Sequence, residues 1–156
     1  MSAIFELRAA ITTDAPALTA IAFTAKRHWG YPEAWIQRWR DTLTITPEYV
    51  AANSCFAAID ERGEILGFAA LRVEAGEFSI DHVWVLPAAM GRGIGRQLFE
   101  HCEAEARKTG ATILKVEADP NAEAFYARMG MRTFDRVEAA MDGVERFLPL
   151  MEKAVQ

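Results

Sequence analysis

Three glycines at alternating positions constrain this chain more than any other stretch. In DHVWVLPAAMGRGIGRQLFE, residues 81–100, an apolar run stops at Pro87, and Gly91, Gly93 and Gly95 then lead into an amphipathic helical pattern. The first N–H groups of a helix have no partner within the helix, and they carry the positive end of the helix dipole. Glycine removes the Cβ atoms that would keep a phosphate away from such groups. The stretch therefore predicts phosphate binding, whereas a simple helix cap needs only one glycine.

Two common nucleotide motifs do not fit this turn. The Rossmann pattern G-x-G-x-x-G needs a third glycine at position 96, which is Arg96, and the P-loop pattern G-x-x-x-x-G-K-[ST] is absent. A Rossmann turn also follows the first strand of a parallel βαβ unit, whereas this turn follows a strand expected to run antiparallel to its predecessor. Arg92 and Arg96 can add charge-assisted contacts to a phosphate. Nucleotide binding is therefore disfavoured but stays open as an alternative.

Hydrophobic spacing along the rest of the chain predicts a mixed α/β fold. Strands are expected over residues 4–8, 54–60, 64–74, 77–86, 113–118, 131–137 and 144–150. Helices are expected after Thr12 or Thr13, near Pro32, at Thr46-Pro47, from Gly93 to Thr109, and after Asp119-Pro120-Asn121. The expected order is one strand, two helices and an antiparallel meander, then β-α-β-α-β-β with a crossover helix after the third meander strand. We expect one domain over residues 1–156.

Composition excludes several classes of function. A hydrophobic content of 51% supports a globular core, and a net charge of −5 argues against wrapping a nucleic acid. No apolar run approaches the roughly 18 residues that a membrane helix needs, and the start MSAIFELRAAITTD lacks a signal-peptide pattern. We therefore expect a cytoplasmic protein without nucleic-acid or membrane partners. Cys55 and Cys102 fit buried hydrophobic positions, and two lone cysteines predict no metal site.

Two motifs together resemble the GNAT superfamily of N-acetyltransferases. Residues 83–87 (VWVLP) and 90–95 (MGRGIG) resemble its acetyl-CoA signature, a strand ending V-x-P followed by [QR]-x-x-G-x-[GA]. Met90 departs from the usual Gln or Arg, which affects only a side-chain contact. Residues 121–131 (NAEAFYARMGM) resemble the family element N-x-x-A-x-x-F-Y-x-x-x-G-F, with the alanine register offset. The resemblance covers essentially the whole chain in element order.

The resemblance implies a fold, a cofactor and a reaction. The fold is an antiparallel meander whose third strand splays away from the strand that follows the signature helix. The reaction moves an acetyl group from acetyl-CoA to a primary amine by direct attack, and homodimers are common in the family. A non-catalytic acyl-CoA-binding or regulatory module on the same fold is the alternative. The resemblance implies cofactor contacts at Val83, Trp84, Val85, Gly91, Arg92, Gly93, Ile94, Gly95, Arg96, Asn121 and Phe125.

Three residues are candidates for proton transfer. Tyr126 matches the family's usual general acid, and a phenol with a pKa of about 10 is close to a thiol in acidity; the alternative is a tyrosine that packs on the sheet. Asp81 and His82 precede the expected splay. His82 can accept a proton near pH 7, or it is a hydrogen-bonded structural histidine, and Asp81 can anchor an ammonium. Because consecutive strand residues face opposite sides, at most one of the two is expected on a given face.

The segment KRHWGYPEAW, residues 26–35, is expected to cover the acceptor. Trp29 and Tyr31 are the candidate substrate-binding residues. Their aromatic rings suit a flat or cationic amine, whereas Lys26 and Arg27 suit a carboxylate, as in an amino acid or a peptide terminus. The sequence leaves both acceptor classes open.

Overall fold

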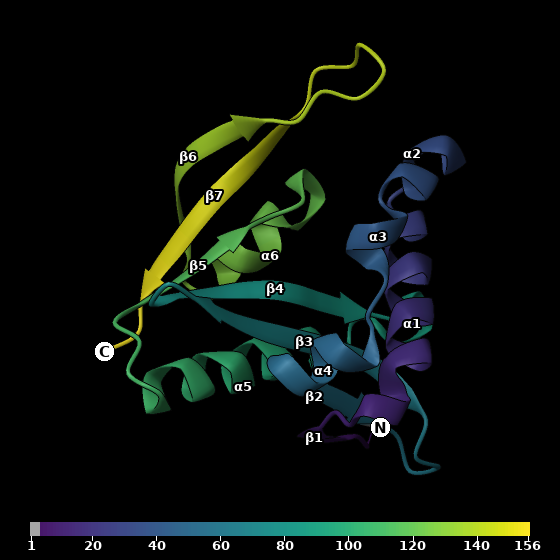
Figure 1. Ribbon diagram of the computed structural model, residues 1–156, viewed down its shortest axis with the longest axis vertical. Coiled ribbons are helices and arrows are strands. Elements are labelled where there is room, and N and C mark those ends of the chain that lie inside the picture. Colours follow the sequence, from purple (N-terminus) through teal and green to yellow (C-terminus); the bar gives the residue numbers. More distant parts are fainter. Residues whose placement is uncertain (1–3) are drawn as a thin grey trace.

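A seven-stranded sheet forms the centre of the molecule in a computed structural model that describes residues 4–156. Its strand order is β1-β2-β3-β4-β5-β7-β6 (Figure 1). Strands β1 to β4 are antiparallel neighbours, β4 and β5 run parallel, and β7 pairs antiparallel with both β5 and β6. The strands are β1 (Glu6–Ala9), β2 (Ser54–Ile59), β3 (Ile65–Glu74), β4 (Glu77–Val85), β5 (Ile113–Glu117), β6 (Arg132–Glu138) and β7 (Phe147–Ala154). This mixed sheet confirms the expected fold class.

Within residues 4–156, six α-helices cover the sheet where the sequence supplies caps and apolar spacing. The Thr46 side chain accepts a hydrogen bond from the Tyr49 N–H and caps the helix that begins at Pro47. Gly30, with a φ of 84°, ends the first helix in the left-handed conformation. The helices are α1 (Ala15–His28), α2 (Glu33–Arg38), α3 (Arg40–Leu43), α4 (Pro47–Ala52), α5 (Ile94–Lys108) and α6 (Glu123–Arg128).

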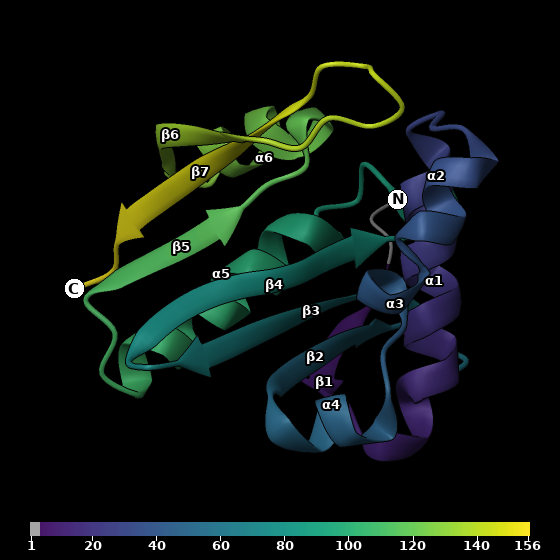
Figure 2. The same cartoon turned by 45° about the horizontal axis from the view of Figure 1, so that its top comes forward.

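The helices divide between the two faces of the sheet (Figure 2). Helices α5 and α6 pack over one core, which contains Phe99, Leu114 and Met151. Helices α1 to α4 pack over the other core, which contains Leu18, Ile36 and Phe68. The crossover helix α5 therefore connects the parallel strands β4 and β5 across one face, while α1 to α4 cover the opposite face.

Strand β4 carries a bulge that opens the sheet. Ala70 of β3 pairs with His82, but the next residue, Leu71, pairs with Ile80, so Asp81 is an extra residue on β4. Within residues 4–156, the parallel pairing of β4 with β5 covers only Phe78–Ile80 and Leu114–Val116. Beyond the bulge the two strands diverge, as Figure 2 shows. The splayed strand implied by the resemblance is present.

Two elements differ most from the sequence prediction, whereas the other boundaries shift by one or two residues. The second helix is two helices, because the backbone at Trp39 (φ −89°, ψ 7°) leaves the helical conformation between α2 and α3. The last strand was expected over 144–150, but β7 begins at Phe147 and continues to Ala154. Asp142 and Gly143 both have positive φ in the hairpin turn, and the strand's polar end is held by pairing with β5. The local hydrophobic pattern carries no information about pairing with β5, so it could not predict the end of this strand.

Candidate active site

The turn before α5 exposes its backbone as the glycine pattern predicted. Gly91 and Gly93 have φ values of 81° and 82°, and Gly93 is the N-cap residue of this 15-residue helix. A Cβ atom built on either residue would meet no atom within 4 Å, so the space above the turn is open. Positive φ explains why glycine is favoured at both positions. The first N–H groups of α5 therefore face open space that can admit a phosphate.

Gly95 has a second reason to be glycine. It lies inside the first turn of α5, where a Cβ atom would approach Phe125 Cε1 to 3.1 Å. Phe125 packs beside this turn and lines the same cavity. The three glycines therefore divide into two that shape the turn and one that allows α6 to approach α5.

The side chains around the turn complete a cradle suited to phosphate. Arg92 donates to the Ala88 carbonyl oxygen at 3.3 Å. Arg96 and Met90 line the cavity, and Met90 is 41% exposed. Ile94 is buried and fixes the first turn of α5 on the core. Arg92 lies outside the cavity lining, so of the two predicted arginines Arg96 is the one placed to meet a pyrophosphate at the helix N-terminus.

The open edge of β4 supplies further backbone donors and acceptors. The Leu86 N–H donates to the Leu66 carbonyl oxygen at 2.9 Å, on the β3 side. Because peptide groups alternate between the two edges of a strand, Trp84 also faces β3, whereas Val83 and Val85 face the divergence from β5. The N–H and C=O groups of Val83 and Val85 are therefore directed toward the gap, and Trp84 takes part through its indole ring, which lines the cavity.

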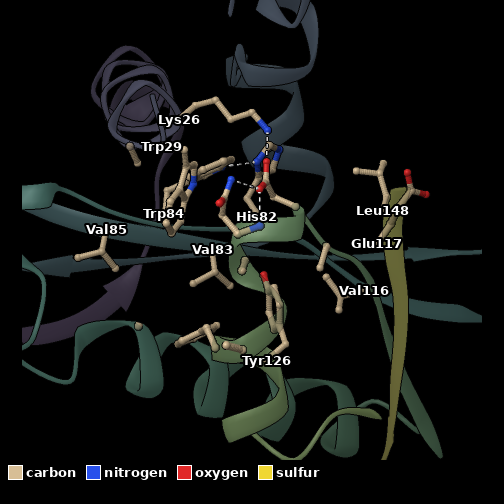
Figure 3. Close-up of a pocket in the computed structure, with 18 of the residues that line it drawn as sticks. Lys26, Trp29, His82, Val83, Trp84, Val85, Val116, Glu117, Tyr126 and Leu148 are labelled. Carbon is tan, nitrogen blue, oxygen red and sulfur yellow. Dashed lines mark hydrogen bonds and ion pairs between the residues drawn. The ribbon is translucent and has the colours of Figure 1, made fainter. Parts of the chain in front are cut away.

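A cavity of about 900 Å³ joins the glycine turn to the open strand edge. Figure 3 shows Lys26, Trp29 and Trp84 on one side of it and Tyr126 reaching in from the other. Asp81, His82, Val83, Val85, Asn121 and Arg146 also line this cavity. A single volume thus connects the candidate anion site with the candidate acid and base.

Tyr126 lies at the centre of this cavity. The residue is buried on α6, with 6% of its surface exposed, and its ring packs against Phe99 and Phe125. Burial raises the pKa of the Tyr126 phenol, so its hydroxyl keeps its proton at neutral pH. The hydroxyl points into the cavity (Figure 3). It is therefore a protonated donor next to the open strand edge.

The bulge places Asp81 and His82 together, contrary to the expectation that they face opposite sides. Tyr49 of α4 donates a hydrogen bond to Asp81 Oδ2, and the His82 ring packs edge-on against Tyr49. Asp81 Oδ2 lies 3.8 Å from His82 Nε2. Strict alternation fails here because the extra residue rotates the strand by half a pleat.

His82 is held as a neutral, hydrogen-bonded histidine. Trp84 Nε1–H donates to His82 Nδ1 at 2.9 Å, so Nδ1 is unprotonated and the ring proton is on Nε2. Burial lowers the pKa of His82, with Asp81 opposing and Arg72 adding to the shift. In this arrangement the Nδ1 lone pair, the only one available on the neutral imidazole, already accepts the hydrogen bond from Trp84 and cannot accept a proton from a substrate. His82 thus orients the Trp84 indole.

The end of the cavity predicted to hold the acceptor contains a charged cluster, which is formed by Lys26, Tyr31, Asp119, Asn121 and Arg146. Lys26 donates to Asp119 Oδ2 at 2.6 Å, and the Tyr31 hydroxyl lies 3.0 Å from both Asp119 oxygens. Asn121 donates its backbone N–H to Asp119 Oδ1 at 2.8 Å. Burial alone would raise the pKa of Asp119, but the charge and hydrogen bond of Lys26 hold that pKa below its usual value. Burial lowers the pKa of Lys26 itself, and Asp119 partly offsets this effect.

The residues proposed for the acceptor separate in the structure. Trp29 is 38% exposed and lines the cavity mouth, whereas Tyr31 lies behind the lining and holds Asp119. Trp39, at the junction of α2 and α3, also lines the cavity. Arg27 points outward and pairs with Glu33 at 2.8 Å. Of the two basic residues in this segment, only Lys26 faces the site.

Sequence reasoning missed three residues of this site. Asp119 gave only a helix-opening signal, Tyr49 lay in a short helix with no motif, and Arg146 lay in an expected strand. Asp119 and Arg146 line the cavity, and Tyr49 contacts it through its hydrogen bond to Asp81. The three residues come from different segments, so no local spacing connects them. Within residues 4–156, no group of three or more His, Cys, Asp or Glu side chains is placed to hold a metal ion. Over the same residues, none of the helices has the length and apolarity needed to span a bilayer.

Sequence comparison finds the acetyltransferase (GNAT) family over residues 12–131. The chain is 38% identical over 85 residues to streptothricin acetyltransferase of Streptomyces lavendulae, which covers 51% of this chain and 45% of that protein. It is 33% identical over 97 residues to blasticidin-S acetyltransferase of Streptomyces morookaense, covering 61% and 71%. The chain spans about half the length of the first curated relatives that it matches.

Solved structures share this fold over nearly the full chain. A GCN5-related N-acetyltransferase from Rhodopseudomonas palustris matches with a TM-score of 0.79 and 25% identity, covering 99% of this chain and 98% of that one. The PaiA N-acetyltransferase of Thermoplasma acidophilum, solved in complex with coenzyme A, matches with a TM-score of 0.79 and 19% identity, covering 97% and 99%.

Proposed function

The chain belongs to the acetyltransferase (GNAT) family, and from that premise we propose that it transfers an acetyl group from acetyl-CoA to a primary amine. One observation carries the proposal: a single cavity joins the bare N-terminus of α5, the open edge of β4 and the Tyr126 hydroxyl. These are the three features that a phosphate-bearing thioester donor requires. The size of the cavity leaves room for an acceptor beside the donor.

Acetyl-CoA fits the cradle described above. The N–H groups from Gly91 to Arg96 would hold its pyrophosphate, because two positive-φ glycines leave the space above them empty. The backbone groups of Val83 and Val85 would bind the pantetheine arm in place of the missing β5 partner. Asn121 keeps its Oδ1 free of hydrogen bonds from the described residues and would contact the same arm. Bound there, acetyl-CoA supplies an activated acyl group with a thiolate leaving group.

The chain's own residues then meet two electrostatic demands. An N–H of the open β4 edge would stabilise negative charge on the thioester oxygen. Tyr126, still protonated because burial raises its pKa, would donate a hydrogen bond to the departing sulfur. Both donors are fixed by secondary structure before the reaction begins.

The amine must lose a proton before it attacks, because an alkyl amine has a pKa near 10. We assign this role to Asp81, which lines the cavity and is oriented by Tyr49. Asp81 would attract the ammonium and accept its proton through a water molecule. His82, whose lone pair is used by Trp84, serves as a positioning residue.

Three wider assignments belong to the same proposal. We propose that residues 1–156 act as one acetyltransferase domain, and that the protein works in the cytoplasm. Cys55 and Cys102 are both free thiols, which suits a reducing compartment. The acceptor would be a small molecule or a peptide amine, and a homodimer stays a prediction.

Release of CoA thiol tests the proposed function. Acetyl-CoA is incubated with the protein and a library of primary amines, and free thiol is measured with the acetylated product. We expect amine-dependent release. Binding of acetyl-CoA without release for any amine would favour the non-catalytic module. Stabilisation by ATP or NAD but not by CoA would favour nucleotide binding instead.

A further inference from the structure

Arg146 is buried against the cavity without a close counter-ion. It lies between the β6–β7 turn and the start of β7, and its side chain is 10% exposed. Its guanidinium donates to the Ala139 carbonyl oxygen at 3.3 Å and to the Tyr31 hydroxyl at 3.4 Å. The nearest carboxylate oxygen, Asp119 Oδ2, lies 3.9 Å away. Charge-assisted bonds are normally about 2.7–2.9 Å long, so all three contacts are weak for a buried arginine.

Asp119 cannot compensate for Arg146, because its own charge is already engaged. Lys26 is its short ion pair at 2.6 Å, and Tyr31 and Asn121 supply its other hydrogen bonds. The cluster therefore contains two cations and one carboxylate, and its charge is +1 by that count. A buried guanidinium in this situation needs an anion from outside the chain.

The aromatic walls at this end are already occupied by the protein's own cations. Lys26 Nζ lies 4.2 Å from the Trp39 ring centre and 5.0 Å from that of Tyr31. Arg146 Cζ lies 5.0 Å and 5.3 Å from the same two centres. A cationic acceptor group would therefore find both rings in use and two positive charges beside them. This arrangement disfavours the cationic class that the sequence left open.

We propose that the acceptor amine carries a carboxylate and that Arg146 binds this carboxylate through its guanidinium fork. This inference rests on the proposed acetyl transfer and names the substrate class for that site. Arginine matches a carboxylate bidentately, which would replace the long contacts to Ala139 and Tyr31. Asp81 lines the same cavity from the β4 bulge and attracts the amine. Asp81 provides a negative charge for the amine, and Arg146 provides a positive charge for the carboxylate. Together they fit a zwitterion such as an amino acid.

Contacts between the β6–β7 hairpin and α2 favour a small acceptor over a protein segment. Asp142 at the tip of the β6–β7 hairpin accepts from Trp35 Nε1 at 2.8 Å and pairs with Arg38 of α2. The hairpin, whose second arm includes Arg146, thus bridges to α2, and Figure 1 shows the hairpin and α2 at the same end of the molecule. Free amino acids and short peptides share the carboxylate but differ in its distance from the amine.

The test compares matched acceptors that differ only in the carboxylate. Thiol release is measured for L-amino acids and their primary amides, for β-alanine and γ-aminobutyrate, and for glycylglycine. We expect kcat/KM to be at least about 10-fold higher for each accepted acid than for its amide. The glycylglycine and ω-amino acid arms report the distance between amine and carboxylate.

Variants tie that preference to Arg146. Arg146→Gln should lower kcat/KM for acids by about 10- to 100-fold, the usual range for a charged hydrogen bond, and leave amides unchanged. Arg146→Lys keeps the positive charge but not the guanidinium fork, so its kcat/KM for acids should lie between those of the wild type and Arg146→Gln. Arg27→Gln is the matched control, because Arg27 is an outward arginine of α1; it should behave as wild type. The affinity for CoA should be the same in all four proteins.

Each outcome decides the proposal. Equal rates for acids and amides, or an unchanged acid preference in Arg146→Gln, would overturn it and leave acetyl transfer intact. A loss of CoA affinity in Arg146→Gln would instead make Arg146 a donor ligand. If no amine releases thiol, the proposed acetyl transfer is wrong. In that case, calorimetric titration of the CoA-loaded protein with the same acid and amide pairs tests the carboxylate site without relying on activity. Binding of acids over amides that depends on Arg146 supports the carboxylate site, and its absence rejects it.

Discussion

Burial sets the protonation states of individual side chains in this site. Tyr126 and His82 are both buried beside the cavity, but the effect on proton affinity is opposite for the two groups. Burial disfavours the charged form, so it keeps the proton on the phenol of Tyr126 and keeps it off the imidazole of His82. The same physical cause therefore makes one residue a donor and the other a neutral acceptor.

We expect Tyr126→Phe to keep CoA affinity and to lower kcat. The ring and its packing against Phe99 and Phe125 are preserved, and only the hydroxyl is lost. General acid effects span about 10²- to 10⁴-fold, and the raised pKa of Tyr126 makes full proton transfer to a thiolate less favourable. The loss should therefore be near about 10²-fold, in kcat and kcat/KM together. Steady-state thiol release and CoA binding measure it, and a wild-type rate in the variant would make Tyr126 structural.

We expect the buried His82 to contribute to acid sensitivity. Its pKa in the folded state lies below the ordinary value of 6.5, so the unfolded chain binds more protons between these two values. The stabilising contribution is complete above about pH 6.5 and is lost as pH falls toward the folded-state pKa. His82→Asn retains an acceptor for the Trp84 indole but cannot titrate.

Urea unfolding at several pH values checks this prediction. From pH 7.5 to 5.5 the free energy of unfolding should fall more for wild type than for His82→Asn. From pH 7.5 to 8.5 the two proteins should change in parallel. A parallel change through the acid range as well would show that His82 is not the group responsible.

At the scale of elements, the turn into α5 and the bulge in β4 differ in how far the sequence reveals them. The turn was predictable because its requirement is local: Gly91 and Gly93 adopt positive φ, which favours glycine. The bulge at Asp81 was not, because register depends on the partner strand. The cluster of Lys26, Asp119 and Arg146 was also hidden, since its members come from three segments that only the tertiary fold brings together. The break between α2 and α3 contains no Gly or Pro, the residues that normally indicate a helix end in a sequence.

We expect Gly93→Val to abolish CoA binding while the fold is retained. Valine at a φ of 82° is strained by about 1–3 kcal/mol, and its side chain would occupy the open space above the turn. Gly63→Val is the matched control, because Gly63 has a φ of 81°, has no neighbour within 4 Å of its Cβ position, and lies in the β2–β3 turn outside the cavity lining. Both variants should lose similar stability in urea unfolding, but only Gly93→Val should lose CoA affinity in calorimetry. Similar CoA affinity in both would show that the glycine turn is not the phosphate site.

At the scale of the whole molecule, the candidate active site lies where two halves of the sheet meet. Strands β1 to β4 form one half and β5 to β7 the other, and their shared ladder covers only Phe78–Ile80 against Leu114–Val116. Helix α5 connects the halves on one face, and the Lys26–Asp119 pair connects α1 to the loop after β5 on the other. Under the proposed function, the donor and the acceptor would both bind along this boundary.

The short ladder between β4 and β5 implies that the ligand completes the protein's own hydrogen bonding. Amide hydrogens of Val83 and Val85 have no strand partner on the β5 side, so in heavy water they should exchange with deuterium rapidly in the free protein. Bound CoA should slow their exchange, while the amide of Trp84, already paired with β3, should change little. Mass spectrometry or NMR at residue resolution can compare the three. Equal protection of Val83, Trp84 and Val85 before ligand is added would contradict this. The opposite result would mean that bound CoA takes the place of a missing strand partner and completes the hydrogen bonding of β4.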